Sequence, residues 1–155
     1  MGKHNHYRDK GFSRGRVSAG GAEQVEQDLR ELGEHVLEAA KKALETGVNE
    51  VVADAKSRCP EYQGHKKGDR VYMMRGVAPG ALRDSIKATP NSQRTVYKIS
   101  ADAKSEGGFL YGQIVEFSPR VNKPFLYPAL DAKKQSVADG IYEAVKSAMS
   151  ATGGG

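Results

Sequence analysis

The most regular pattern in the chain is a stripe of apolar residues between about Glu23 and Arg58. Its members recur every three or four residues, as they do on one face of an α-helix. They are Val25, Leu29, Leu32, Val36, Ala40, Leu44, Val48, Val51 and Ala55. The pattern predicts a helix roughly 50 Å long. Gly33 and Gly47 each weaken this helix by about 1 kcal/mol relative to Ala, which predicts a bend or break near either glycine.

A segment rich in glycine and proline, residues 60–80, follows the helix and is expected to be a long loop. Residues 81–87 fit either a short helix or the start of a strand. From Thr95 to Ala101 apolar and polar residues alternate, and Phe109–Phe117 is a second run of strand-forming residues. The link at 102–108 contains two glycines, which predicts a hairpin between these two runs.

Pro124 begins a last helical pattern that extends to about Met149. Its apolar positions are Leu126, Leu130, Val137, Ile141, Val145 and Ala148. Together the elements predict an α+β fold class, with a long N-terminal helix, a small antiparallel β-sheet and a C-terminal helix packed on the sheet. We expect three parts: a basic flexible arm at 1–22, a single α+β domain at 23–150 with a loop insertion at 60–80, and a flexible tail at 151–155.

The composition is polar for a folded domain of 155 residues, with 38% hydrophobic and 7% aromatic residues and no Trp. A thin core of this kind fits a chain that buries further surface against neighbours, and it fits a monomer with long solvated helices equally well. The net charge is +5. Residues 1–21 contain five Lys and Arg residues against Asp9, a charge of +4, which leaves +1 for the rest. The basic character therefore belongs to the arm, and such arms bind nucleic acid or acidic protein surfaces.

The sequence shows no motif typical of catalysis or of metal binding. There is no phosphate-binding glycine loop, no local Ser/His/acid signature and no paired-cysteine spacing. Cys59, the single cysteine, precedes Pro60 and is expected to be a small packed side chain rather than a nucleophile. No apolar run approaches the roughly 20 residues of a membrane span. We therefore expect a protein that is not an enzyme, holds no cofactor or metal and has no membrane partner.

Three short motifs occur in order in the second half of the chain. They are Gly80-Ala81-Leu82-Arg83-Asp84-Ser85-Ile86, Tyr111-Gly112-Gln113-Ile114-Val115-Glu116-Phe117 and Pro124-Phe125-Leu126-Tyr127-Pro128-Ala129-Leu130. The ordered set resembles the tail-component family of tailed phages, also called neck or tail-completion proteins. That family has Gly-x-Leu-Arg-x-Ser-Ile, Tyr-Gly-x-x-Val-Glu-Phe and Pro-Phe-Leu-x-Pro-Ala-Leu at the matching places. Its long helix also ends in a small residue and proline, as this one does at Cys59-Pro60.

The resemblance covers about residues 25–149, with three departures. Nineteen residues lie between Pro60 and Gly80, where the family usually has a few. Ser118-Pro119 follows the Glu-Phe pair, where the family usually has Gly. The basic arm lies outside the resemblance.

Physical roles can be assigned to several of the matching residues. Proline fixes φ near −65°, so Pro124 presets the turn into the last helix and Pro128 fits its first turn. Phe125 is expected to anchor this helix to the sheet and the long helix. On a strand, Tyr111, Val115 and Phe117 would share one apolar face. Glu116 would then lie on the exposed face, either solvated or paired with Arg83 or Arg120 of a ring neighbour.

The resemblance implies a structural virion protein of the head–tail junction, made in the host cytoplasm. It implies a homo-oligomeric ring, a hexamer or dodecamer, that contacts other neck, portal-side and tail-tube proteins and makes non-specific contact with DNA in the channel. A tail terminator and a minor tail protein are alternatives within the virion. A small basic nucleic-acid-binding protein is a more remote alternative, and the nearly neutral folded part counts against it.

The arm has two interpretations. It is either a solvated tail or a segment that becomes ordered on a partner. In the second case Tyr7 and Phe12 would be the anchors. Arg8, Lys10, Arg14 and Arg16 would meet carboxylates or phosphates.

Overall fold

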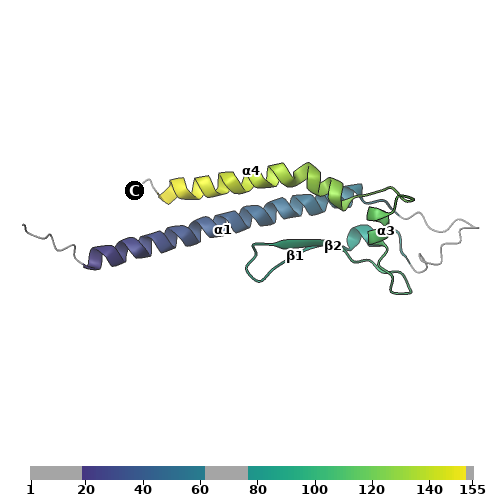
Figure 1. Ribbon diagram of the computed structural model, residues 1–155, viewed down its shortest axis with the longest axis horizontal. Helices are drawn as coiled ribbons and strands as arrows, with labels where there is room; N and C mark the ends of the chain where they lie inside the picture. The colour runs from purple at the N-terminus through teal and green to yellow at the C-terminus, as the bar shows by residue number, and fades with distance from the viewer. Residues whose placement is uncertain (1–18, 62–76, 153–155) are drawn as a thin grey trace, which may run out of the picture.

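The computed structural model describes residues 19–61 and 77–152. Its elements, in chain order, are α1 (Ala19–Arg58), α2 (Ala81–Asp84), β1 (Ile86–Pro90), β2 (Tyr97–Ala101), α3 (Gly112–Phe117) and α4 (Leu126–Thr152). In Figure 1, α1 and α4 lie side by side along the long axis of the molecule, with the strands on the other side of α1. The predicted α+β class is confirmed: a long N-terminal helix, an antiparallel sheet and a packed C-terminal helix.

The first helix is one continuous element of 40 residues. It passes through Gly33 and Gly47 without a break, so the predicted break is wrong. The physical reason at Gly47 is packing, because this buried glycine lies directly against Val137 of α4. Side-chain pairs one turn apart, such as Arg30 with Glu26 at 2.7 Å, support the exposed face of α1.

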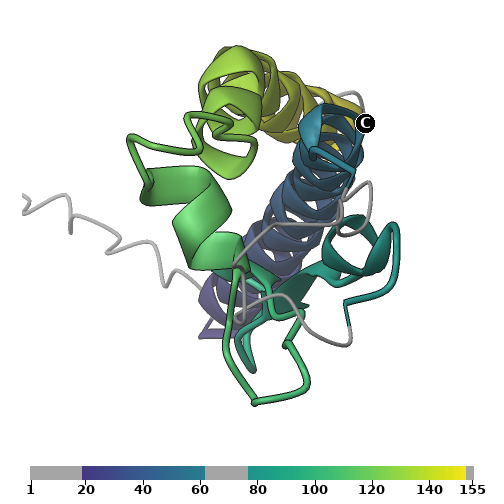
Figure 2. The ribbon, with the colours of Figure 1, turned by 90° about the vertical axis from the view of Figure 1, so that its right-hand side faces the viewer.

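The core lies at the C-terminal end of α1, where all the elements meet. Its fully or nearly buried members are Val51, Ala55, Leu82, Ile86, Tyr111, Phe125 and Ala129. Figure 2, which looks onto this end of the molecule, shows α4, α3 and the strands arranged around α1. Phe125 and Ile86 are the largest fully buried side chains. Phe125 immediately precedes α4, so its burial fixes the place where that helix begins.

The sheet is a single antiparallel hairpin, in which Ile86 pairs with Ala101 and Pro90 pairs with Tyr97. Asn91 shapes the connection, because its side-chain oxygen accepts hydrogen bonds from the backbone N–H groups of Thr95 and Val96. The predicted hairpin between 95–101 and 109–117 is therefore wrong. The strand at 97–101 pairs with the segment before it, and the 102–110 link contains only an isolated bridge between Lys104 and Leu110.

The segment 112–117 forms the short helix α3 rather than the predicted strand. Strand-forming composition is a weak guide to structure, because strand propensity depends strongly on tertiary context. In the helix, Tyr111 is buried and Val115, four residues later, packs against the core. Phe117 is 64% exposed, so the expected apolar face shared by all three residues is wrong. The basic arm to residue 18, residues 62–76 of the predicted loop and the last three residues lie outside the described residues.

Candidate assembly interface

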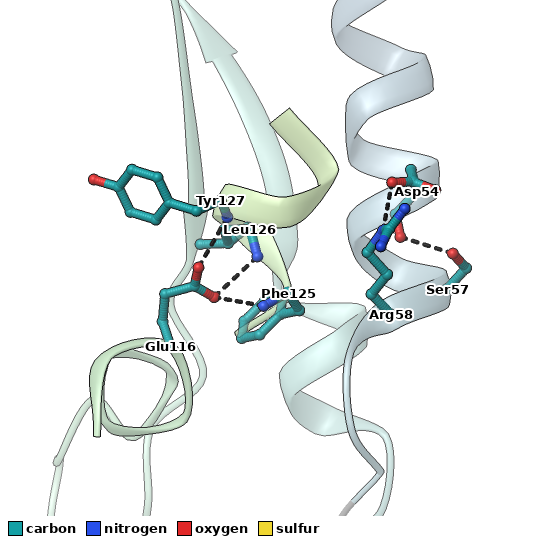
Figure 3. Close-up of polar contacts among 7 residues, drawn as sticks. All are labelled: Asp54, Ser57, Arg58, Glu116, Phe125, Leu126 and Tyr127. Atoms are coloured by element: carbon teal, nitrogen blue, oxygen red, sulfur yellow. Dashed lines mark hydrogen bonds and ion pairs between the residues drawn. The ribbon is translucent and has the colours of Figure 1, made fainter. Parts of the chain in front are cut away.

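The side chain of Glu116 reaches from α3 to the start of α4 (Figure 3). Its Oε2 atom accepts hydrogen bonds from the backbone N–H groups of Phe125 at 2.8 Å and Leu126 at 2.9 Å. Its Oε1 atom accepts one from the N–H of Tyr127 at 2.8 Å. Glu116 is only 7% exposed. The predicted exposed position of Glu116 is therefore wrong, because both carboxylate oxygens are used inside the chain.

This arrangement accounts for every free N–H group at the start of α4. The first turn of a helix leaves its N–H groups without intrahelical partners. Glu116 accepts three of them, and the next residue, Pro128, has no N–H to satisfy. The N–H of Ala129 then makes the first helical hydrogen bond, to the carbonyl of Phe125. A carboxylate is also favoured here by the helix dipole. The predicted place of Pro128 in the first turn of the last helix is confirmed.

Two aromatic rings mark the exposed side of the junction between α3 and α4. Phe117 and Tyr127 make an edge-on contact with ring centroids 5.7 Å apart. Their residues are 64% and 58% exposed. The Glu116 cap holds the backbones of both elements, so this pair is presented on a fixed surface. Ile114 and Leu130, on the same two helices, are also large exposed apolar residues.

A shallow groove of about 290 Å³ lies beside this pair, between β2 and the first turns of α4. Its lining is formed by Val51, Tyr97, Ile99, Leu126, Tyr127 and Leu130. None of the six was predicted as a site residue. Sequence periodicity places Leu126 and Leu130 in the buried stripe of the last helix, yet Leu130 is 47% exposed. We refer to this feature as the β2–α4 groove.

The opposite end of the molecule carries a second apolar surface. In Figure 1 the N-terminal part of α1 extends past the end of α4. Val25 and Leu29, which the sequence stripe places on a buried face, are 58% and 63% exposed. All described side chains from Glu23 to Glu31 are exposed. We refer to residues 19–31 as the α1 overhang.

The overhang is acidic, whereas the hairpin is basic. Residues 19–31 contain Glu23, Glu26, Asp28 and Glu31 against Arg30, a net charge of −3. Residues 86–101 contain three cations, Lys87, Arg94 and Lys98, and no acid. Within the chain, Arg94 at the hairpin turn already pairs with Glu38 of α1 at 2.9 Å. A hydrogen bond from Lys41 lowers the pKa of the Glu38 carboxyl, and Arg94 lowers it further.

The structure places the other residues of the predicted motifs in structural positions. Gly80 is buried with a φ of 79°, a conformation that favours glycine, and it precedes the short helix that carries the core residue Leu82. The Ser85 hydroxyl closes this helix by donating to the carbonyl of Leu82 at 2.7 Å. Arg83 is exposed and lies 3.4 Å from Asp84.

The remaining predicted site residues lie at the surface or outside the described residues. Pro60 is half-buried after the end of α1. Pro124 and Arg120 are exposed in the segment between α3 and α4. The arm residues Tyr7, Arg8, Lys10, Phe12, Arg14 and Arg16 fall outside the described residues, so their partner-binding role stays a prediction.

Two ionisable groups lie near the end of α1: Tyr111 is in the core, and Cys59 is partly buried and packs against it. Burial raises the pKa of the Cys59 thiol to about 11. Burial also raises the pKa of the Tyr111 phenol. The Tyr111 hydroxyl is buried and has no hydrogen-bond partner within residues 19–61 and 77–152. Among residues 19–61 and 77–152, no three His, Cys, Asp or Glu side chains cluster as metal ligands would. None of the described helices has the length and apolar character needed to cross a membrane.

The comparison with protein families assigns this chain to a class of phage structural proteins. The sequence model of the family described as bacteriophage HK97-gp10, putative tail-component, matches residues 23–117, more than half of the chain. The protein therefore belongs to the HK97-gp10-like family of phage tail components. The match includes the Gly80 and Glu116 motifs and ends before the proline motif at 124–130. No curated protein matches the chain. No solved structure matches it either.

Proposed function

We propose that this tail component acts at the head–tail junction, where identical subunits form a closed ring that joins the tail to the DNA-filled head. The observation that carries the proposal is the presence of two different apolar surfaces at opposite ends of one rigid helix pair. One is the α1 overhang, and the other is the Phe117–Tyr127 pair with its groove. Dissimilar surfaces suit a head-to-tail contact, which closes into a ring when the rotation between subunits allows it.

The proposed mechanism is assembly, without catalysis and without a cofactor. The other partners in this role are the neck, portal-side and tail-tube proteins, together with non-specific contact with DNA in the channel. The ring copy number would follow the symmetry of the portal or the tail, as a dodecamer or a hexamer. The basic arm would bind an adjacent subunit or neck protein rather than DNA, because its few cations alone make only a modest, salt-sensitive contact.

Removal of the gene from its phage tests this role. We expect DNA-filled heads and finished tails of normal length to accumulate unjoined, and a plasmid copy of the gene to restore joined particles. A loss of length control in the tails would instead identify a tail terminator. Location of a tagged subunit along the tail tube, away from the junction, would identify a minor tail protein. Either result would contradict the proposed junction role.

A further inference from the structure

We propose that the α1 overhang of one subunit docks in the β2–α4 groove of the next subunit. This inference deepens the proposed ring by naming the two surfaces that meet. It joins two apolar features that the fold of a single subunit leaves uncovered.

The length of the overhang follows from the contact between Gly47 and Val137. α1 and α4 run in opposite directions, and these residues lie against each other. α4 continues 15 residues past Val137, to Thr152, so with the same rise per residue it ends near the level of Leu32. Residues 19–31 therefore extend about 20 Å beyond the helix that covers the rest of α1. The apolar stripe of α1 continues onto this part through Leu29 and Val25, with nothing from α4 to cover it.

The overhang cannot reach the groove of its own subunit. Val51 lines that groove and belongs to the same continuous helix as Leu29. The two residues are 22 positions apart, which corresponds to about 33 Å along the helix axis. A single straight helix cannot fold back over that distance. The contact must therefore join two copies of the chain.

Chemistry favours this pairing over a contact between two overhangs. Two overhangs would bring together segments that each carry a net charge of −3. The groove instead lies at the start of α4, directly after a segment that contains Arg120 and Lys123. Asp131, the nearest acid of α4 in sequence, is already paired with Lys134 at 2.9 Å. The Glu38–Arg94 pair is an example, inside one subunit, of a contact between an acid of α1 and a base of another element.

The contact is expected to be weak for one pair of subunits and secure in a closed ring. Only a few apolar side chains on each side are available, well below a standard stable interface. In a ring each subunit uses both surfaces, so the contacts support one another. The contact is therefore better detected by trapping it as a disulfide bond than by measuring an equilibrium affinity.

The experiment uses single-cysteine variants of the full chain in a Cys59→Ala background. Protein carrying Leu29→Cys is mixed with protein carrying Leu130→Cys under mild oxidation. We expect a disulfide-linked heterodimer to form several-fold faster than with Gln27→Cys, which lies on the opposite face of the same exposed turn. The rate should fall as salt is added, because the acidic overhang and the basic segment before α4 attract each other. A chain carrying both Leu29→Cys and Leu130→Cys should give a ladder of linked subunits.

Three outcomes would overturn the inference. They are equal rates for Leu29→Cys and Gln27→Cys, no linkage above random collision, or faster linkage between two Leu29→Cys chains than between Leu29→Cys and Leu130→Cys. The junction role can fail separately. If the 29–130 linkage forms but labelled subunits are absent from the head–tail junction of the virion, the docking contact stands and the proposed function falls. If labelled rings occupy the junction without this linkage, the function stands and the docking contact falls.

Discussion

Gly47 of α1 and Val137 of α4 lie so close that a side chain on the glycine would collide with the valine. A Cβ atom placed on Gly47 would lie 2.7 Å from Cγ1 and 2.8 Å from Cγ2 of Val137. Real Cβ atoms essentially never approach so closely, and the branched valine cannot swing its methyl groups away cheaply. Gly47 is thus the residue that lets the two long helices approach each other here.

We predict that Gly47→Ala destabilises the domain although alanine is the better helix former. The gain in helix propensity is about 1 kcal/mol, whereas overpacking typically costs about 1–3 kcal/mol. The expected net loss in the free energy of unfolding is up to about 2 kcal/mol by urea denaturation. Adding Val137→Ala should recover part of the loss arising from the collision, and a double-mutant cycle measures that coupling.

Gly33→Ala is the matched control. Gly33 lies in the same helix, but a Cβ there would have nothing within 4 Å. The substitution should raise the free energy of unfolding by up to about 1 kcal/mol. Equal effects at the two glycines would show that helix propensity alone matters and that the Gly47 contact is not tight.

The Glu116 cap leads to a second prediction. Glu116→Ala leaves the N–H groups of Phe125, Leu126 and Tyr127 without their acceptor, so the free energy of unfolding should fall by about 2–4 kcal/mol. Glu116→Gln keeps one acceptor oxygen but turns an NH₂ donor toward backbone donors, so it should also destabilise the domain. Glu143→Gln, at an exposed position of α4, is the control and should change little. A Glu116→Gln variant as stable as this control would show that the carboxylate is dispensable.

Phe125 is completely buried beside the capped end of α4. Phe125→Ala should therefore lower the free energy of unfolding by about 3–5 kcal/mol. Phe117→Ala, which truncates an exposed ring, is the control and should lower the free energy of unfolding far less. Thermal unfolding of the two variants under one set of conditions distinguishes them, and similar midpoints would contradict the assigned core.

Local sequence signals predicted the two long helices well, but predicted the sheet and the short helix α3 poorly. The stripe of α1 and the prolines at 124 and 128 give strong, local information, and both long helices were predicted within a few residues of their bounds. The pairing of strands depends on tertiary contacts: β2 pairs with Ile86–Pro90, and the strand-like segment at 112–117 is a helix. The helical form of that segment is what points Glu116 at the start of α4.

The candidate interface was the part least accessible to sequence reasoning. Val25 and Leu29 fit the same periodic stripe as Val51, and only the length of α4 shows that they are uncovered. Gly47 shows the same limit. In the sequence it indicates only a weakened helix, and its close contact with Val137 becomes visible only in the structure. The buried acid Glu116 gave no local sign of its role, since its three N–H partners lie nine to eleven residues further on.

The buried thiol and phenol predict a loss of stability at alkaline pH. The pKa of Cys59 is raised from an ordinary value of 9.0 to about 11, and the pKa of Tyr111 is also raised. At a pH between the unfolded and the folded pKa of such a group, the unfolded chain has lost a proton that the folded chain keeps. The free energy of unfolding therefore falls as pH rises. The contribution of Cys59 is fully present below about pH 9 and is lost as pH rises toward about 11.

Urea denaturation between pH 8 and pH 11 measures this dependence, and Cys59→Ala isolates the thiol. The free energy of unfolding should decline less steeply with pH in the Cys59→Ala variant than in the natural chain. Alkylation of the native thiol at pH 8 should also be slow, about a hundredfold below that of a thiol with the ordinary pKa, because two pKa units reduce the thiolate fraction by that factor. Labelling at the rate of an exposed thiol would contradict the assigned burial of Cys59.

The α1 overhang leads to a prediction that separates folding from assembly. Val25 and Leu29 are mostly exposed, so replacing both with Gln, a good helix former, should change the free energy of unfolding by less than about 1 kcal/mol. Val51→Ala, in the core, should lower the free energy of unfolding more than either change.

If the overhang is an assembly surface, the stable Val25→Gln/Leu29→Gln protein should nevertheless fail to restore joined, infectious particles to a phage that lacks the gene. A matched Gln24→Ala/Gln27→Ala variant, altered on the polar side of the same turns, should restore them. Full recovery of infectivity by the first variant would show that these apolar residues take no part in assembly. A large loss of its stability would show that the overhang is covered within the subunit.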